Sequence, residues 1–453
     1  MSDLSGRLRA ELQDVVYVPG DDEYASATSP DNSSYPQHPA AVIRPRSAEQ
    51  VGHAVGSVSR LGATVVVQAT GHGAGGPVDD DQVLLDTSTL TGVTVDPTAR
   101  TARIEGGSTW PAVQVAAQRH GLLALSGTSP TVGVAGYTFG GGVSWFIRKH
   151  GLASAALHTV EYVDGAGRLR TAADDATDPL DREALWAFRG GAPVGIATSI
   201  KVGLFPVPDL WTGYLLWPES ALSAVISAWT SATGAVSPSV TSTLSLLKLP
   251  SSGPFPDELL SNPAVHLSFV SPDGGAPLEV MRKVLRAAAL PALDTTGPGD
   301  LQSLSAIHLD PSTAVPARGT GRWLGPDATD VIGAMFGAAR IGQPDGLNMI
   351  ELRHTDSQAT GVDGALTRVP APFLLHAVGA AVDGDARSRI DRALGEVATA
   401  GRTADIGRAA PSFREGQPDV ADAWSLSELA RLRAVRSALD PDGALKFQRH
   451  PVT

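Results

Sequence analysis

The stretch of sequence that decides the fold covers residues 126–152, SGTSPTVGVAGYTFGGGVSWFIRKHGL. It holds Gly133, Gly136 and a run of three glycines at 140–142, more than a packed core element tolerates without a reason. We therefore predict that its backbone comes close to a flat or phosphorylated molecule. A second segment of this kind, RGGAPVGIAT at 189–198, adds three more glycines.

A third glycine-rich turn lies upstream, within VVVQATGHGAGGPVDDD at 65–81. Its glycines match the GxGxxG pattern of dinucleotide-binding βαβ units, which need a helix directly after the glycines to hold pyrophosphate. Pro77 and three aspartates follow instead, and then another strand, so the pattern does not favour an NAD site. A turn without a helix still holds pyrophosphate through successive backbone N–H groups, and this one would place His72 beside the bound molecule.

Composition excludes several classes of function. The chain has 453 residues, of which 42% are hydrophobic and 18% charged, as in ordinary folded proteins. A formal net charge of −12 argues against binding nucleic acid or an anionic membrane. The chain has no cysteine, which excludes disulfides, thiolate metal sites and cysteine nucleophiles, and we expect no metal site. No segment approaches the ~20 apolar residues of a membrane helix, so we expect a cytoplasmic protein.

The pattern of elements predicts an α+β protein with three regions. Residues 1–206 alternate short strands with helices, including one that begins at Ser47 with Gln50 three residues later. Residues 207–403 alternate longer amphipathic strands with helices, which is typical of an antiparallel sheet covered by helices on one side. Residues 404–453 contain one more helix and form a C-terminal segment.

These motifs, in this order, resemble a known family. The GH turn, PTVGVAGYTFGGG, RKHGL, LWAFRGG and a terminal DP…F segment are similar to the FAD-linked oxidases of the vanillyl-alcohol oxidase and p-cresol methylhydroxylase (PCMH) superfamily. The closest resemblance is to the berberine bridge enzyme-like group. It implies a PCMH-type FAD-binding domain at about 36–206, to which residues 404–453 return, and a substrate domain at 207–403 that covers the isoalloxazine ring.

The resemblance also implies which residues hold FAD. His72 takes the position of the histidine that is joined covalently to the 8α-methyl group of the flavin; the alternative is a loop histidine that only hydrogen-bonds nearby backbone. Loop amides around 71–75 would hold the pyrophosphate. The full set is Thr70, Gly71, His72, Gly73, Ala74, Gly75, Ser129, Val132, Gly133, Gly136, Tyr137, Gly140, Gly141, Gly142, Val143, Gly195, Ile196 and Phe413.

The chain departs from the family at several of these positions. Ser129 stands where many members carry a second flavin-linking cysteine, so only the histidyl link is expected. Tyr137 replaces a histidine that supports the flavin N1 and C2 carbonyl; its hydroxyl would donate the same hydrogen bond, or its ring would simply pack on the flavin. The family's C-terminal tyrosine base is absent, since Ser412 and Phe413 stand where asparagine and tyrosine are usual.

A catalytic base must therefore come from elsewhere. The candidate is His376, which interrupts an apolar strand and as a neutral imidazole would accept a proton near pH 7; the alternative is a core histidine bonded to backbone. Glu351 and Arg353 share one face of a neighbouring strand, where they form either a plain ion pair or the polar end of the pocket.

The leading hypothesis is an FAD-dependent oxidase that moves hydride from an alcohol, amine or natural-product C–H to flavin N5 and forms hydrogen peroxide from dioxygen. Val132 supports it, because the family tends to carry valine there in oxidases and leucine in dehydrogenases. The alternatives are a dehydrogenase with another acceptor, a flavin-binding enzyme of non-redox cyclisation or isomerisation, and a cofactor-free binding protein. A small organic substrate, including one from secondary metabolism, fits each enzyme class, and the oligomeric state stays open.

Overall fold

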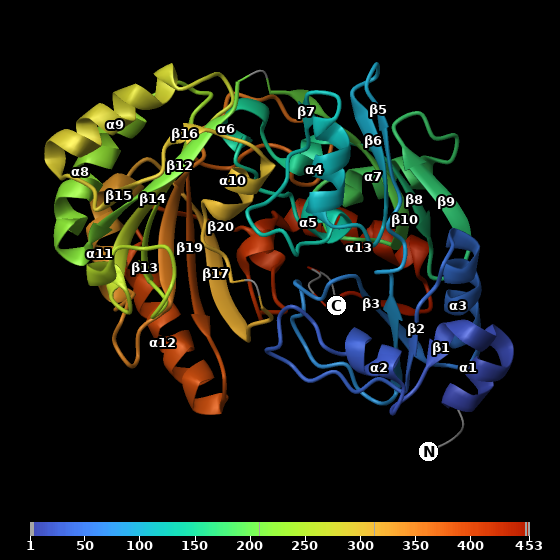
Figure 1. The fold of residues 1–453 in the computed structure, drawn as a ribbon. Helices are drawn as coiled ribbons and strands as arrows, with labels where there is room; N and C mark the ends of the chain where they lie inside the picture. Colours follow the sequence, from blue (N-terminus) through green and yellow to red (C-terminus); the bar gives the residue numbers. More distant parts are fainter. Residues whose placement is uncertain (1–3, 208, 312, 449–450, 452–453) are drawn as a thin grey trace.

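The computed structural model describes residues 4–207, 209–311, 313–448 and 451. Its N-terminal half contains two small sheets (Figure 1). In the first sheet the strand order is β1 (Val16–Tyr17), β2 (Ala41–Ile43), β4 (Gln82–Asp86), β3 (Thr64–Gln68) and β21 (Leu445–Lys446). Side chains of this sheet form a core with α1 (Leu4–Leu12) and α3 (Ala48–Arg60). Helix α3 begins as predicted, because the Ser47 side chain accepts a hydrogen bond from the Gln50 backbone.

The second sheet is antiparallel. Its order is β5 (Val93–Asp96), β6 (Thr101–Glu105), β10 (Ile196–Gly203), β8 (Leu157–Val163) and β9 (Leu169–Ala173). Residues of this sheet share one core with α4 (Trp110–Gln118), α7 (Pro179–Phe188) and α13 (Leu426–Leu439). A short pair, β7 (Leu122–Leu123) and β11 (Phe205–Pro206), lies beside it.

The second half is a large antiparallel sheet. Its order is β15 (Leu293–Asp294), β12 (Trp211–Pro218), β14 (Pro263–Ser271), β13 (Thr241–Lys248), β18 (Met349–His354), β19 (Phe373–Ala380), β17 (Ala317–Leu324) and β20 (Asp405–Ala409), with β16 (Gly297–Pro298) paired to β12. Four helices cover its outer face, namely α8 (Leu222–Thr233), α9 (Ala276–Ala288), α11 (Ala328–Ala338) and α12 (Gly384–Ala400) (Figure 1). The predicted α+β class, with an antiparallel sheet covered by helices, is confirmed.

Side-chain alternation makes the other face of this sheet polar at its centre. Leu244, Leu352 and Leu375 belong to the core under the helices. Their strand neighbours point the opposite way, so Ser245, Glu351 and His376 stand side by side across β13, β18 and β19. All three are buried. The large sheet therefore presents a row of buried polar groups toward the N-terminal half.

The C-terminal segment connects the two halves. Strand β20 (Asp405–Ala409) still pairs with β17 in the large sheet, although it lies beyond residue 403, where the sequence places the end of the substrate region. The chain then passes through α13 to β21, which pairs in parallel with β3. The division at 206 and 403 into domains stays a prediction.

Several short helices carry no amphipathic pattern that the sequence reveals. They are α2 (Asp22–Ala27), α5 (Val134–Phe139), α6 (Ile147–His150) and α10 (Leu301–Ala306). Two of them contribute to the site, because α5 runs through the glycine-rich stretch and α10 leads into the loop that carries His308.

Candidate active site

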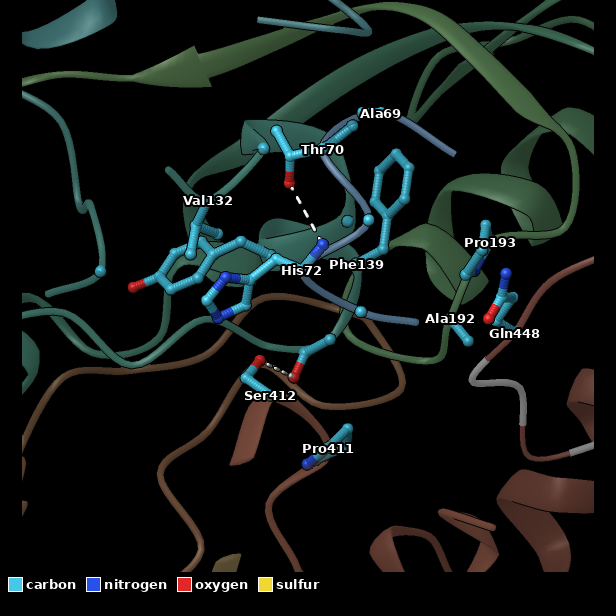
Figure 2. Close-up of a pocket in the computed structure, with 18 of the residues that line it drawn as sticks. Ala69, Thr70, His72, Val132, Phe139, Ala192, Pro193, Pro411, Ser412 and Gln448 are labelled. Atoms are coloured by element: carbon cyan, nitrogen blue, oxygen red, sulfur yellow. Dashed lines mark hydrogen bonds between the residues drawn. The ribbon is translucent and has the colours of Figure 1, made fainter. Parts of the chain in front are cut away.

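The His72 turn is a loop between β3 and β4. No helix follows its glycines, as the sequence predicts, because β4 begins at Gln82. Gly71 has φ +72°, and a Cβ there would lie 2.3 Å from the Cβ of Pro30, so the turn requires glycine. The His72 backbone N–H donates to the Thr70 hydroxyl at 3.3 Å. The loop thus holds His72 on a fixed backbone at the edge of a cavity (Figure 2).

One cavity collects most of the residues that the sequence assigns to FAD. Its walls come from the His72 loop, the 127–143 and 192–197 segments, and the C-terminal segment. The predicted residues that line it are Thr70, Gly71, His72, Gly73, Ala74, Ser129, Val132, Gly133, Gly136, Tyr137, Gly140, Val143, Gly195, Ile196 and Phe413. Three of the four residues predicted to act in catalysis, Tyr137, Arg353 and His376, line the same cavity.

Three predicted cofactor residues are placed differently. Gly141 and Gly142 do not line the cavity; both have positive φ and form a turn packed against Leu366 and Tyr137. A Cβ on Gly142 would lie 2.5 Å from the Tyr137 ring, so this glycine makes room for the tyrosine rather than for the ligand. Gly75 does not line the cavity either. Its N–H donates to Oε1 of Gln448 at 2.9 Å.

Tyr137 presents a buried hydroxyl to the site. Its ring packs edge-on against Trp110, with centroids 5.3 Å apart. The hydroxyl has no hydrogen-bond partner among the residues that the structure describes. Burial raises the pKa of Tyr137 above its ordinary value, so the phenol stays protonated and is available as a donor.

Glu351 is the centre of a buried charge cluster. Its Oε1 accepts from Nε of Arg353 at 2.7 Å, its Oε2 lies 2.7 Å from Nε2 of His308, and its Oε1 lies 3.3 Å from Nδ1 of His376. The carboxylate is fully buried and does not line the cavity. The carboxylate therefore lies behind the cavity wall and holds three cationic side chains. Of the two predicted roles, the ion pair with Arg353 is present, whereas the role of Glu351 at the polar end of the pocket needs correction, because Glu351 does not line the cavity.

Each imidazole also has a second carboxylate partner. Nδ1 of His308 lies 2.9 Å from Oδ1 of Asp310, and Nε2 of His376 lies 3.2 Å from Oε2 of Glu415. Despite burial, the flanking carboxylates raise the pKa of both histidines to about 9. The neighbouring cations hold the pKa of Glu351 well below its ordinary value. The three carboxylates balance the three cations.

The protonation of His376 corrects the sequence-based expectation. A neutral imidazole was expected as a proton acceptor near pH 7, but a histidine with a pKa of about 9 is an imidazolium at that pH. Its ring lies between two carboxylates and not against backbone carbonyls, so the core-histidine alternative is wrong as well. The cavity-facing carboxylates able to accept a proton are those of Asp310 and Glu415.

The C-terminal loop supports this arrangement. Ser412 donates to the carbonyl of Gly140 at 3.2 Å (Figure 2). The Phe413 ring lies 4.9 Å from the Arg353 guanidinium carbon and 5.0 Å from the His376 ring. Phe413 therefore packs against the two cations instead of supplying a hydroxyl base.

Among the residues of the site that sequence reasoning missed are His308, Asp310, Glu415 and Gln448. Each lies outside helices and strands, where no repeating pattern of hydrophobic residues indicates which side chains face a site. The one available signal was the short spacing of His308 and Asp310 in IHLD. In the described part of the chain no group of three or more His, Asp or Glu side chains is arranged to hold a metal ion.

Comparison with known proteins identifies the cofactor class. An FAD binding domain model matches residues 39–173. The chain also shares its whole fold with berberine bridge enzyme-like 1 of Physcomitrella patens, with a TM-score of 0.81, 19% identity and 98% of both chains covered. The chain therefore contains an FAD binding domain and is similar to berberine bridge enzyme-like proteins. The resemblance found in the sequence is thereby confirmed.

Two curated proteins are similar to part of the chain. The chain is 28% identical to (R)-6-hydroxynicotine oxidase of Paenarthrobacter nicotinovorans over 212 residues, which are 46% of this chain and 45% of that protein. It is 30% identical to xylooligosaccharide oxidase of Thermothelomyces thermophilus over 217 residues, 46% of this chain and 42% of that protein. The chain thus matches less than half the length of these relatives.

The residues of the cavity fit an FAD molecule. Glycine-rich backbone from the His72 loop and the 127–143 segment gives close access, and Tyr137 offers a buried hydroxyl that has no partner in the described chain. The acid–base cluster lies at the same cavity, where the reactive ring of a flavin would need it. None of the described helices is long and apolar enough to cross a membrane.

Proposed function

We propose that the protein is an FAD-dependent oxidase of a small alcohol, amine or natural-product C–H, linked to its flavin through His72. The observation that carries the proposal is that one cavity brings His72 and the glycine segments together with Arg353, His376 and Glu415. The names of both curated relatives, one an oxidase of a hydroxynicotine and one of xylooligosaccharides, support oxidation with dioxygen.

FAD would be held by the His72 loop and the backbone around Gly133 and Gly136, and when bound it supplies an acceptor for the substrate hydride. The Tyr137 hydroxyl would donate a hydrogen bond to an electron-rich atom of the ring. Arg353 and His376 place two positive charges at the cavity, where they favour developing negative charge on the ligand.

Oxidation of a CH–OH or CH–NH group also releases a proton from the heteroatom, and we assign its uptake to Glu415. The carboxylate lines the cavity and lies 3.2 Å from the His376 imidazolium, which orients it. His376 is thus a positioning residue whose proton stays on the ring during turnover.

The acceptor is assigned to dioxygen on the basis of Val132. Its side chain lines the cavity opposite the C-terminal residues (Figure 2). A β-branched valine is one methylene shorter than leucine, and so leaves room for a small gas molecule beside the ring. If dioxygen does not use this space, the alternative is a dehydrogenase that passes its electrons to a different acceptor.

A second candidate is non-redox cyclisation or isomerisation, in which the flavin serves as scaffold. The pair of carboxylate–imidazolium arms, Asp310–His308 and Glu415–His376, favours it, because proton removal at one arm and return at the other needs no oxidant. The mass of the product separates the two candidates: oxidation removes two hydrogens, whereas isomerisation leaves the mass unchanged.

The first test is the absorbance spectrum of the purified protein before and after acid precipitation. Yellow colour that stays with the pellet and is lost from it in His72→Ala is the expected result. A colourless protein from flavin-replete cells contradicts the proposal. Anaerobic addition of alcohols, amines and phenolic natural products should then bleach the flavin for the right class.

A further inference from the structure

Gln448, close to the C-terminus, makes an unusual contact with the His72 loop. Its side-chain oxygen accepts from the backbone N–H of Gly75 at 2.9 Å and from that of Gly76 at 3.2 Å. Glycine-rich turns bind anions in this way, with consecutive backbone N–H groups pointing at one oxygen. Here the chain itself supplies that oxygen.

The position of Gln448 is set by the strand before it. Strand β21 pairs in parallel with β3, Leu445 opposite Val65 and Lys446 opposite Val66. Because β3 leads directly into the His72 loop, Phe447 and Gln448, which follow β21, lie alongside that loop. Both line the cavity with His72, and Figure 2 labels Gln448 and His72 among the lining residues.

Helix α13 fixes the strand in turn. Both carboxylate oxygens of Asp440 accept from the backbone, one from Ala444 and the other from Leu445. The guanidinium carbon of Arg436 lies 4.8 Å from the centre of the Phe447 ring. The segment that precedes Gln448 is therefore itself held in place by contacts with Arg436 and Asp440.

The opposite side of the loop is held by a different segment. The backbone N–H of Asp31 donates to the Thr70 carbonyl at 3.0 Å, and that of Asn32 donates to the Gly71 carbonyl at 3.3 Å. His72 lies between this anchor and the one at 75–76. Its backbone is thus held on both sides, and at Gly75 and Gly76 the acceptor that the described residues supply is the side-chain oxygen of Gln448.

We propose that Gln448 is a positioning residue for the attachment of FAD to His72, an inference that rests on the proposed covalent link. Attachment forms a bond between a His72 ring nitrogen and the 8α carbon of the flavin and breaks one N–H and one C–H bond. The two protons and two electrons released remain on the flavin, from which dioxygen takes them up as hydrogen peroxide. Gln448 touches none of these atoms and acts by holding the loop.

The test compares the rate of attachment with the amount of FAD bound. Apoprotein is mixed with FAD, and samples taken over time are split: one half is measured by absorbance for total flavin, the other is acid-precipitated for linked flavin. In Gln448→Leu, which keeps size but removes the acceptor, we expect attachment to slow about tenfold while total binding stays close to that of the wild type. Gln448→Glu keeps an acceptor oxygen and should restore most of the rate.

Two controls make the outcome decisive. Gln118→Leu, at an exposed position on α4, should attach FAD at the wild-type rate. Hydrogen exchange of the 70–77 peptide should rise in Gln448→Leu and not in Gln448→Glu, independently of any flavin. If wild type and Gln448→Leu both become linked at the same rate, the role of Gln448 is overturned and the link stands. If the wild type binds FAD without a link, the link itself is overturned and the role of Gln448 with it.

Discussion

Replacing Glu351 by glutamine removes the one charge that holds three buried cations together. Nη2 of Arg353 lies only 3.0 Å from Nε2 of His308, and this approach of two positive groups is tolerable because Glu351 accepts from both. A glutamine keeps the size of the side chain but brings no negative charge, and its NH2 group faces at least one donor. Glu351→Gln should therefore destabilise the folded protein strongly.

The pKa shifts give the size of the effect. Raising a histidine pKa from 6.5 to about 9 corresponds to roughly 3 kcal/mol of stability for each ring. Because His308 and His376 share Glu351, the two contributions do not simply add. Breaking a buried ion pair by removing one partner costs about 3–5 kcal/mol, and we expect Glu351→Gln to fall in this range near pH 6.5.

The pH dependence has a definite sign. A histidine pKa that is higher in the folded than in the unfolded state gives stability that is fully present below about 6.5 and lost as the pH rises through about 9. Without Glu351 this contribution is smaller, because Asp310 and Glu415, which raise the pKa of His308 and His376 most, remain in place. The difference in unfolding free energy between wild type and variant should thus shrink between pH 6.5 and pH 10.

Urea unfolding followed by circular dichroism at pH 6.5, 8 and 10 measures this difference. Glu219→Gln, at an exposed position, is the matched control and should change the unfolding free energy by less than about 0.5 kcal/mol. A loss below about 1 kcal/mol in Glu351→Gln at pH 6.5, or a difference from wild type that stays constant up to pH 10, would refute the account of the cluster.

Three further predictions address the cavity. Glu415→Gln should lower the rate of anaerobic flavin reduction by substrate by about 100-fold or more, measured by stopped flow; a near-normal rate would exclude Glu415 as the proton acceptor. Val132→Leu should leave that rate unchanged and slow reoxidation by dioxygen about tenfold, a barrier change of roughly 1.4 kcal/mol, and equal reoxidation rates would remove the argument for dioxygen. Gly71→Ala should lower the melting temperature and the amount of FAD bound, since the left-handed backbone alone costs about 1 kcal/mol and the new Cβ meets Pro30; unchanged FAD binding would contradict it.

Much of this architecture could be predicted, because local chemistry determines it. The strand of Glu351 and Arg353 has a period of two, so their shared face follows from sequence alone, and the 2.7 Å contact between them agrees with it. The glycine segments were also informative, because glycine in such numbers needs a reason. They were less exact in detail: Gly142 serves the packing of Tyr137 and not the ligand.

What the sequence did not reveal depends on chain segments that meet only in the folded state. His308 and Asp310 follow a six-residue helix with no amphipathic pattern, and Glu415 lies in a loop that reaches the sheet after the chain has left β20. Burial lowers the pKa of His376, but Glu415 and Glu351 outweigh this effect and raise it. A histidine viewed only within its own apolar strand therefore looks neutral, although the folded protein makes it a cation.

Because His376 is protonated near neutral pH, the pH dependence of activity distinguishes Glu415 from His376 as the group that accepts the substrate proton. If Glu415 accepts the proton, kcat/KM requires the His376 imidazolium beside it, and activity should fall as the pH rises through about 9. If a neutral His376 were the base, activity should instead rise through the same pH. The profile should be measured as the anaerobic rate of flavin reduction at low substrate concentration from pH 6 to pH 10.5, so that reoxidation does not enter. In His376→Asn the alkaline limb should disappear while some activity remains, because Glu415 is still present; a rate that rises through pH 9 in the wild type would return the catalytic role to His376.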